Sequence, residues 1–386
     1  MKLIGIILGA ALLWLLQGIL FKHWWKKGLS VQLSFCRPFA VEGEAAGLTE
    51  IITNAKYLPL PILHVKFQMG RGLIFSHDAN STITDQNYRS DIFSCMPWQQ
   101  IRRNLTFQCR KRGFYQIRQA DFVSYDLLWT SPFVTSVPVA TSMYVYPAFV
   151  DPLRLELLLR CLTGTMAARR SLVRDPFQLQ SIRDYQYGDP YRDVNWKATA
   201  RTGELKVNVH APSSSWQVTL LLDGTGDRLW EDTDLKEEAV RLCATLADSL
   251  MARQIPVSVR TNGRDCITHT EASLKAGSGP GHLQSVMELL ARLDLSDPKR
   301  RTMENLIEEL TEETDSRPAE ASAEFSSALY ILISSCRKTA LAEAFTELCK
   351  KAPGSQWIIP LRPGDKAQIS ISPIYGTVYE WEVPYA

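Results

Sequence analysis

The sequence predicts an α+β protein with an N-terminal transmembrane helix, a β-sandwich-like domain and an α/β domain built on a parallel sheet. Three observations predict this fold class. A stretch of nineteen uncharged residues lies near the N-terminus, short runs of alternating apolar and polar residues follow it, and strand-like and helix-like segments alternate after about residue 216. A chain of 386 residues has room for two or three domains of roughly 100–200 residues each.

The first segment, residues 3–21 (LIGIILGAALLWLLQGILF), contains no charge and one strongly polar side chain, Gln17. As a helix it would span about 28 Å at about 1.5 Å per residue, close to the thickness of a bilayer core. Residues 22–27 (KHWWKK) then place two tryptophans beside three lysines, a composition typical of the membrane interface. We therefore interpret residues 1–27 as a transmembrane anchor with a basic interface collar.

The lysines indicate which side of the membrane holds the rest of the chain. Only Lys2 and the amino terminus precede the apolar segment, so the positive charge is concentrated after it. By the positive-inside rule this predicts a single-pass protein of the cell membrane with the bulk of the chain in the cytoplasm. The eight cysteines agree, because none lies in a Cys-x-x-Cys pair and scattered thiols are typical of a reducing compartment. A cleaved signal peptide would instead carry basic residues before the apolar run and small residues after it.

Residues 28–150 are predicted to form the β-sandwich-like domain. Apolar and polar residues alternate over 29–33, 63–67 and 105–109, which is the pattern of half-buried antiparallel strands. Turn residues such as Leu60-Pro61 and Arg112-Gly113 separate the runs.

Residues 151–210 are interpreted as a linker helix followed by a motif. Apolar residues recur at helical spacing over 151–173, and the segment ends in a basic patch that includes Arg169 and Arg170. A solvated helix end is the simpler interpretation of this patch, and a partner surface is the alternative.

Residues 211–386 are predicted to form the α/β domain, because strands and helices alternate there and alternation favours a parallel sheet covered on both faces. Ligands of such sheets lie at the carboxyl ends of the strands. Residues 296–324 are polar and acidic, and we interpret them as a solvated short helix and a mobile loop. The expected strands are 217–222, 255–260, 328–333 and 356–361, and the expected helices are 234–253, 282–293 and 339–350.

The motif itself, residues 183–201 (RDYQYGDPYRDVNWKATAR), predicts a capped helix. Asp189 is placed to cap the helix with Pro190 as its first residue, and Gly203 is placed to end it. Arg192 and Trp196 stand four residues apart, so we expect the guanidinium to lie on the indole. By the same spacing Asp193 is expected to pair with Lys197, and the alternation of residues 205–209 predicts a strand.

This motif resembles the signature of the bacterial family called domain of unknown function 58. The layout of anchor, β-rich domain, signature and α/β unit is similar too. Two departures are residues 126–129 (DLLW), where the family tends to carry Asp-Pro-Phe-Gly-Leu, and the single anchor, where many members have two. The matching positions are Arg183, Tyr185, Gly188, Asp189, Arg192, Trp196, Lys197, Ala200 and Arg201.

The family resemblance implies a binding partner more clearly than it implies a catalytic reaction. Family members look like partners of MoxR-type AAA+ ATPases and are often encoded with them and with transglutaminase-like membrane proteins. The signature supplies no activated nucleophile and no recognisable acid–base pair, so we expect no catalytic residues and no enzyme activity. A helix-capping and salt-bridge cluster is the simpler interpretation of these residues. A hydrolase that uses Arg183, Asp189 and Arg192 stays open as an alternative.

A second candidate site follows the first strand of the α/β domain. Asp223, Thr225 and Asp227 stand where von Willebrand A domains, which have a Rossmann-type fold, place the Asp-x-Ser-x-Ser loop that binds Mg²⁺. The resemblance implies a von Willebrand A-like domain and a metal site, and Mg²⁺ is the one cofactor that the sequence suggests. The pattern is incomplete, because Ser334 and Ser335 stand where a more distant ligand is expected and Ser278 replaces a threonine. An aspartate that caps the turn after a strand is the simpler alternative.

These observations predict a membrane-anchored interaction or assembly module. Its expected partners are a cytoplasmic MoxR-type AAA+ ATPase, other membrane proteins, and the lipid bilayer through residues 3–21. Lys plus Arg is 43 and Asp plus Glu is 41, a net charge of +2 that gives no support to nucleic-acid binding. A metal-dependent (MIDAS-like) ligand-binding or adhesion protein and the hydrolase are the two alternatives.

Overall fold

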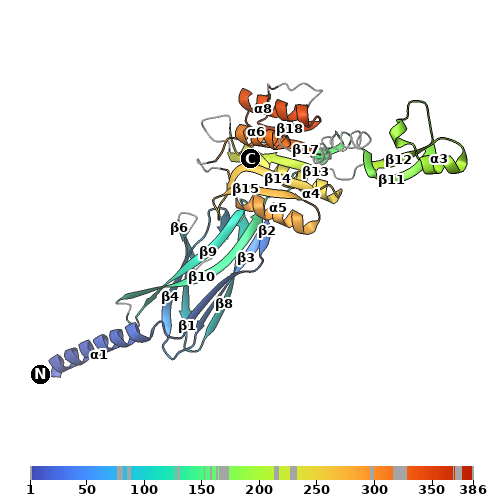
Figure 1. Ribbon diagram of the computed structural model, residues 1–386. Helices are drawn as coiled ribbons and strands as arrows, with labels where there is room; N and C mark the ends of the chain where they lie inside the picture. Colours follow the sequence, from blue (N-terminus) through green and yellow to red (C-terminus); the bar gives the residue numbers. More distant parts are fainter. Residues whose placement is uncertain are drawn as a thin grey trace. The chain divides into compact units, whose positions relative to one another are not determined.

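The computed structural model divides the chain into two compact units, each described by itself below (Figure 1). Unit 1 comprises Met1–Ala148 with Leu290–Arg292, and unit 2 comprises Phe149–Leu289 with Leu293–Ala386. The structure describes residues 2–75, 81–84, 88–126, 128, 131–151, 153–156, 159–161, 164, 174–212, 217–226, 233–295, 300–315, 328–367, 369 and 376–384.

Unit 1 begins with helix α1 (Lys2–Trp24), as the apolar segment predicts. Its stretch Ile4–Trp24 is 21 residues long and apolar enough to span a membrane, a property that a signal sequence also has. The end of α1 packs on the rest of the unit through Phe21 and Trp25, both buried. Their rings lie 5.5 Å and 6.2 Å, centroid to centroid, from that of Phe133. The helix is therefore held at its C-terminal end by aromatic contacts with the sheet domain.

A second set of contacts fixes the chain where α1 ends. Gly28 has φ +68°, and a Cβ added there would lie 2.8 Å from the carbonyl oxygen of Ala55. The Ala55 N–H in turn donates to the Gly28 carbonyl over 2.7 Å. The buried Lys56 ammonium donates to the Trp25 carbonyl, and burial lowers the pKa of Lys56 to about 8. Only glycine fits position 28 without strain, so the residue defines the joint between helix and sheets.

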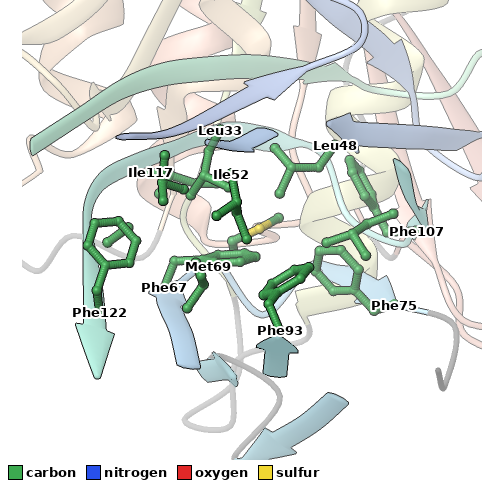
Figure 2. Packing of buried hydrophobic residues seen from close by; sticks show 14 of the residues in the cluster. Leu33, Leu48, Ile52, Phe67, Met69, Phe75, Phe93, Phe107, Ile117 and Phe122 are labelled. Atoms are coloured by element: carbon green, nitrogen blue, oxygen red, sulfur yellow. The ribbon is translucent and has the colours of Figure 1, made fainter. Parts of the chain in front are cut away.

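Two sheets make up the rest of unit 1 and form a sandwich around one apolar core. The order of the first is β1-β3-β8-β5, and that of the second is β2-β10-β9-β4-β7-β6. Figure 2 shows side chains of the core, among them Leu48, Phe67, Phe93 and Phe122, pointing toward one another. The strands are β1 (Leu29–Phe35), β2 (Phe39–Val41), β3 (Ala45–Asn54), β4 (Leu60–Gln68), β5 (Leu73–Phe75), β6 (Ser81–Thr84), β7 (Tyr88–Cys95), β8 (Gln100–Cys109), β9 (Gly113–Tyr125) and β10 (Pro132–Tyr146).

The alternating runs of the sequence correspond to strands of this sandwich. Residues 29–33 lie in β1, 63–67 in β4 and 105–109 in β8. Leu63, Val65 and Phe67 are buried while the residues between them are only partly buried, which is the period-two pattern of a strand with one face on the core.

A polar cluster interrupts this core. Glu50 of β3 and Asp91 of β7 are both fully buried, with Arg89 of β7 and Arg103 of β8 beside them. Asp91 forms ion pairs with both arginines, since Arg89 Nε and Arg103 Nη1 lie 2.7 Å and 3.2 Å from its carboxylate oxygens. Among the described residues, neither carboxylate oxygen of Glu50 has a hydrogen-bond partner. Burial raises the pKa of Glu50 to about 8, and the charge of Asp91 adds to the effect while the two arginines oppose it.

The α/β part of unit 2 is built on a sheet of order β15-β14-β13-β17-β18-β19, with β16 also paired to β14. Strands β14, β13, β17, β18 and β19 are parallel to one another. Strands β15 and β16 each pair with β14 antiparallel. The sheet is thus mixed, with the predicted parallel strands at its centre. The strands are β13 (Gln217–Leu222), β14 (Val257–Asp265), β15 (Glu271–Gly277), β16 (Leu293–Asp294), β17 (Ala328–Ile333), β18 (Ser355–Leu361) and β19 (Gly376–Glu382).

Helices provide the apolar cover of this sheet. Helices α6 (Met303–Asp315) and α8 (Thr339–Lys351) share one core with Leu221 and Trp357. Helix α4 (Thr233–Ala252) contacts strands β13, β14, β17 and β18, and α5 spans Pro280–Arg292. The interpretation of residues 296–324 as solvated is wrong for α6, because four of its side chains are buried at helical spacing. These are Met303, Leu306, Ile307 and Leu310.

The segment expected to form a linker helix is only partly described. Residues 153–156 and 159–161 are helical, whereas Arg169 and Arg170 lie outside the described residues. The eight cysteines are free thiols.

Candidate functional site

The signature lies on a β-hairpin. Strand β11 (Arg174–Asp184) pairs antiparallel with β12 (Lys206–Pro212), and Arg183 lies opposite Val207. The alternation of residues 205–209 predicts β12, whereas nothing in the sequence pattern predicts β11. The segment between the strands holds a short 3-10 helix, η1 (Tyr191–Asp193), and helix α3 (Trp196–Thr202).

The prediction of one helix that starts at Asp189 and Pro190 is wrong. Val194 forms a β-bridge with Val207 and is buried, so it divides η1 from α3. Asn195 caps α3 instead, since its side-chain oxygen accepts from the Ala198 N–H over 2.9 Å. Gly203, with φ +76°, ends the helix as predicted.

The break between η1 and α3 also removes the two expected four-residue pairs. Arg192 and Asp193 lie in η1, whereas Trp196 and Lys197 lie in α3, so the spacing of a continuous helix does not apply to them. The carboxylate of Asp193 lies 3.7 Å from Arg192 Nε, and the Arg192 side chain is 85% exposed.

Arg183 and Asp189 close the loop before η1. The two terminal nitrogens of Arg183 each lie 2.7 Å from one oxygen of Asp189, which is a bidentate ion pair. Asp189 also accepts from the Gln186 N–H over 2.8 Å, and Gly188 turns the chain with φ +103°. The hydrogen bond to Asp189 raises the pKa of Arg183, so this arginine is held as a cation. These three signature residues thus shape the loop of the hairpin.

Several aromatic and basic side chains of the signature face solvent. Tyr187, Tyr191 and Trp196 are 104%, 69% and 65% exposed. The ring of Tyr191 stacks on that of Tyr185, with 5.9 Å between centroids, and burial raises the pKa of Tyr185. We call the exposed aromatic and basic side chains of the motif the signature surface. It consists of Tyr187, Tyr191, Arg192, Trp196, Lys197 and Arg201.

The second candidate site lies where β13 and β17 end, beside Asn262 of β14. Asp223 directly follows β13 and is buried, and its N–H donates to the Ile333 carbonyl over 3.0 Å. One carboxylate oxygen accepts from Thr225 N over 2.8 Å, from the Thr225 hydroxyl and from Asn262 Nδ2 over 2.7 Å. The other accepts from Ser334 Oγ over 2.6 Å. Burial raises the pKa of Asp223, and these hydrogen bonds oppose the rise.

The sequence pattern identified Asp223, Thr225 and Ser334 but missed Asn262. The signal was available, because the polar run Thr261-Asn262-Gly263 follows the predicted strand 255–260. Asn262 also accepts from the Gly224 N–H over 2.8 Å, so its amide ties β14 to the residues that follow β13. Asp227 lies outside the described residues.

In the described structure, the strand-end cluster is held by hydrogen bonds among its own side chains. Within the described part of the chain, no group of three or more His, Cys, Asp or Glu side chains is placed to hold a metal. Both oxygens of Asp223 already accept hydrogen bonds, and Mg²⁺ would have to displace them. The described residues fit a hydrogen-bond cluster that joins the ends of β13 and β17 to β14.

Comparisons with solved structures show only weak similarity, at TM-scores too low to support an argument about fold or function. The seventh ScaB type I cohesin from Pseudobacteroides cellulosolvens is 12% identical with a TM-score of 0.22, over 31% of this chain and 94% of that one. A non-cellulosomal cohesin from the archaeon Archaeoglobus fulgidus is 12% identical with a TM-score of 0.22, over 30% and 91%. A type II cohesin from the Acetivibrio cellulolyticus cellulosome is 10% identical with a TM-score of 0.23, over 30% and 94%.

A family model gives a clearer result. No curated protein matches the sequence, but residues 181–366 match the model described as Protein of unknown function DUF58. The matched region begins at the signature hairpin and continues through β18. The match therefore supports the family that the signature resembles.

Proposed function

We propose that the protein is a membrane-anchored interaction module whose signature surface binds a protein partner, a MoxR-type AAA+ ATPase. The observation that carries the proposal is the exposure of the signature. Arg183, Gly188 and Asp189 shape the loop, and the aromatic and basic side chains of the signature surface are presented to solvent. Large aromatic side chains that served packing alone would be buried, so their exposure here favours recognition.

The chemistry of the signature surface supports this proposal. Tyrosine, tryptophan and arginine are the side chains that most often dominate protein–protein binding energy. The surface combines Tyr187, Tyr191 and Trp196 with the cations Arg192, Lys197 and Arg201. Within α3, Lys197 and Arg201 stand four residues apart and so lie on one face of the helix. A partner with an acidic patch that also has apolar pockets for aromatic rings fits this surface.

The location that we propose follows from α1. Residues 3–21 would cross the bilayer once, the lysine collar would face the cytoplasm, and unit 2 would be a von Willebrand A-like domain in reach of a cytosolic ATPase. Protease added outside intact cells is then expected to leave the C-terminal part of the chain uncut. Digestion of that part would place it outside the cell and make the ATPase unreachable.

The partner is tested by crosslinking in cells, solubilisation of the membranes in detergent and affinity purification of the full chain. We expect the wild type to capture a MoxR-type ATPase. Loss of a single hot-spot side chain costs about 2 kcal/mol, or roughly 30-fold in affinity. Trp196→Ala and Arg192→Ala are therefore each expected to reduce the captured ATPase strongly while the thermal stability of the protein stays unchanged.

Glu204→Ala is the matched control for these variants. Glu204 is an exposed side chain on the same hairpin, but it is acidic and lies outside the signature surface. The Glu204→Ala variant should capture as much ATPase as the wild type. If no such ATPase is captured, or if all three variants behave alike, the proposed partner is wrong.

Two alternative functions make different demands on the same residues. A hydrolase would need a nucleophile beside Arg183 and Asp189, whose charged groups are engaged with each other at 2.7 Å. A metal-dependent ligand-binding protein would need Mg²⁺ beside Asp223, whose oxygens are engaged by hydrogen-bond donors. An interaction module needs neither a nucleophile beside Arg183 nor Mg²⁺ beside Asp223, which is why we favour it.

A further inference from the structure

Three loops of unit 1 carry exposed apolar side chains at the end of the sandwich where α1 joins it. Residues 55–59 join β3 to β4, residues 96–99 join β7 to β8, and Asp126, Leu128 and Ser131 are the described residues of the connection from β9 to β10. Their exposed side chains are Tyr57 (83% exposed), Met96, Trp98 (62% exposed) and Leu128. Soluble surfaces seldom gather apolar side chains of this size on adjoining loops without a partner.

Hydrogen bonds and packing fix the place of these loops. Asn54 donates its side-chain amide to the carbonyls of Leu58 and Met96, each over 3.0 Å, so the first two loops are tied together. The ring centroids of Tyr57 and Trp98 lie 5.5 Å apart, edge to face. Ala55 and Lys56, directly before Tyr57, bond to Gly28 and Trp25 at the end of α1.

The third loop lies at the same end of the unit. It connects Tyr125 to Pro132, which are paired as the last residues of β9 and β10 before the turn. Phe133, next in the chain, contacts Phe21 and Trp25 of the anchor region at 5.5 Å and 6.2 Å between ring centroids. All three loops therefore adjoin the residues that leave the predicted bilayer.

The backbone at Trp98 gives a second, independent observation. The turn Met96–Gln99 is closed by a hydrogen bond of 3.3 Å from the Gln99 N–H to the Met96 carbonyl, and Trp98 has φ +56°. With Pro97 before it, this is the position of a type II turn that glycine or asparagine normally occupies. A bulky residue held there costs roughly 1–3 kcal/mol of strain. Trp98 packs edge to face on Tyr57, but both rings are mostly exposed, so this packing offsets little of the strain and an external contact is favoured.

We infer that these loops form a second membrane contact, in which Tyr57, Trp98 and their apolar neighbours enter the headgroup region beside the anchor. The rings of Tyr and Trp, apolar with one polar group, suit that region. The collar lysines Lys22, Lys26 and Lys27 suit the anionic lipids of a cytoplasmic leaflet. The occupant is a lipid surface, because the loops are continuous with the segment that spans it. The inference rests on the membrane anchor of the proposed function.

Photocrosslinking of the full chain tests the contact. Benzoylphenylalanine is introduced singly in place of Tyr57 or Trp98, and each variant is placed in nanodiscs of phosphatidylethanolamine and phosphatidylglycerol. Leu12, in the middle of α1, is the control for the anchor itself. Phe39 is the matched negative control, since its aromatic ring is also exposed but lies on β2, which follows β1 at the end of the sandwich away from the anchor (Figure 1).

We expect lipid adducts at Leu12, Tyr57 and Trp98 and none at Phe39. Adducts at Leu12 without adducts at Tyr57 and Trp98 would overturn the second contact while leaving the anchor and the proposed function in place. Equal adducts at Phe39 and Trp98 would also overturn it, because the labelling would then be unspecific. Absence of adducts at Leu12 as well would overturn the anchor, and this inference with it.

Discussion

Asp223→Ala is expected to lower the free energy of unfolding of the α/β part of unit 2 by about 2–4 kcal/mol. The change removes a buried acceptor and leaves the donors of Asn262, Ser334 and Thr225 without their partner, at roughly 1–3 kcal/mol for each buried group that stays unsatisfied. Loss of the buried charge offsets part of this cost, since burial already disfavours the ionised carboxyl. Chemical unfolding of the detergent-solubilised chain measures the effect.

Asp234→Ala is the matched control for this variant. Asp234 is an aspartate of the same unit whose exposed side chain pairs with Arg362, and its loss should cost under about 1 kcal/mol. Equal losses for the two variants would contradict the structural role of Asp223. Isothermal calorimetry with Mg²⁺ then tests the metal alternative on the wild type. Binding that disappears in Asp223→Ala would show that a cation displaces the hydrogen bonds, and we expect no such binding.

Glu50→Gln is expected to remove a pH dependence from the stability of unit 1. The pKa of Glu50 is about 8 in the fold, against 4.5 in the unfolded chain, so the folded state holds more protons between these values. Stability therefore falls as the pH rises from 4.5 to 8, and the loss is complete above 8. A shift of this size corresponds to about 3–5 kcal/mol at most. The glutamine keeps the shape and carries no charge, so above pH 8 the variant should be the more stable protein.

Unfolding of the sandwich at pH 5, 7 and 9, followed by hydrogen exchange of the β3 amides, measures this dependence. The groups that face Glu50 are Asp91, Arg89 and Arg103, and the variant leaves all three in place. Glu44→Gln is the control, because Glu44 is exposed on the same domain and bonds only locally to the Val41 N–H. A pH profile in Glu50→Gln that matches the wild type would refute the assignment.

The sequence predicted those parts of the fold that depend on local periodicity. Nineteen uncharged residues predicted α1, and apolar runs predicted β13, β17 and β18. Helix α6 was misjudged because its many glutamates dominate the composition, although Leu306, Ile307 and Leu310 keep one face of it apolar. Strands β11, β15 and β19 have no strong alternation, and they form because the neighbouring strand offers backbone partners.

The candidate sites show the same limit. The signature was recognised from residue types and spacing, but the break at Val194 depends on its bridge to Val207, a contact that periodicity does not reveal. The convergence of Asp223 and Ser334, 111 residues apart in the chain, follows from the parallel order of β13 and β17 and was therefore foreseeable. The buried state of Glu50, unpaired among the described residues, was not foreseeable, since nothing in an alternating strand indicates that Asp91 forms ion pairs with both arginines.

The joint at Gly28 affects how the molecule would search for a partner. A flexible linker after an anchor lets a domain move through a large volume above the membrane. The local concentration of the domain near the membrane surface is then low. Here the Gly28 backbone, the bond to Ala55 and the packing of Phe21 leave little freedom between helix and sandwich. The sandwich would then diffuse in the membrane plane at a nearly constant height, so that encounters with other membrane proteins become a two-dimensional search with a raised effective concentration.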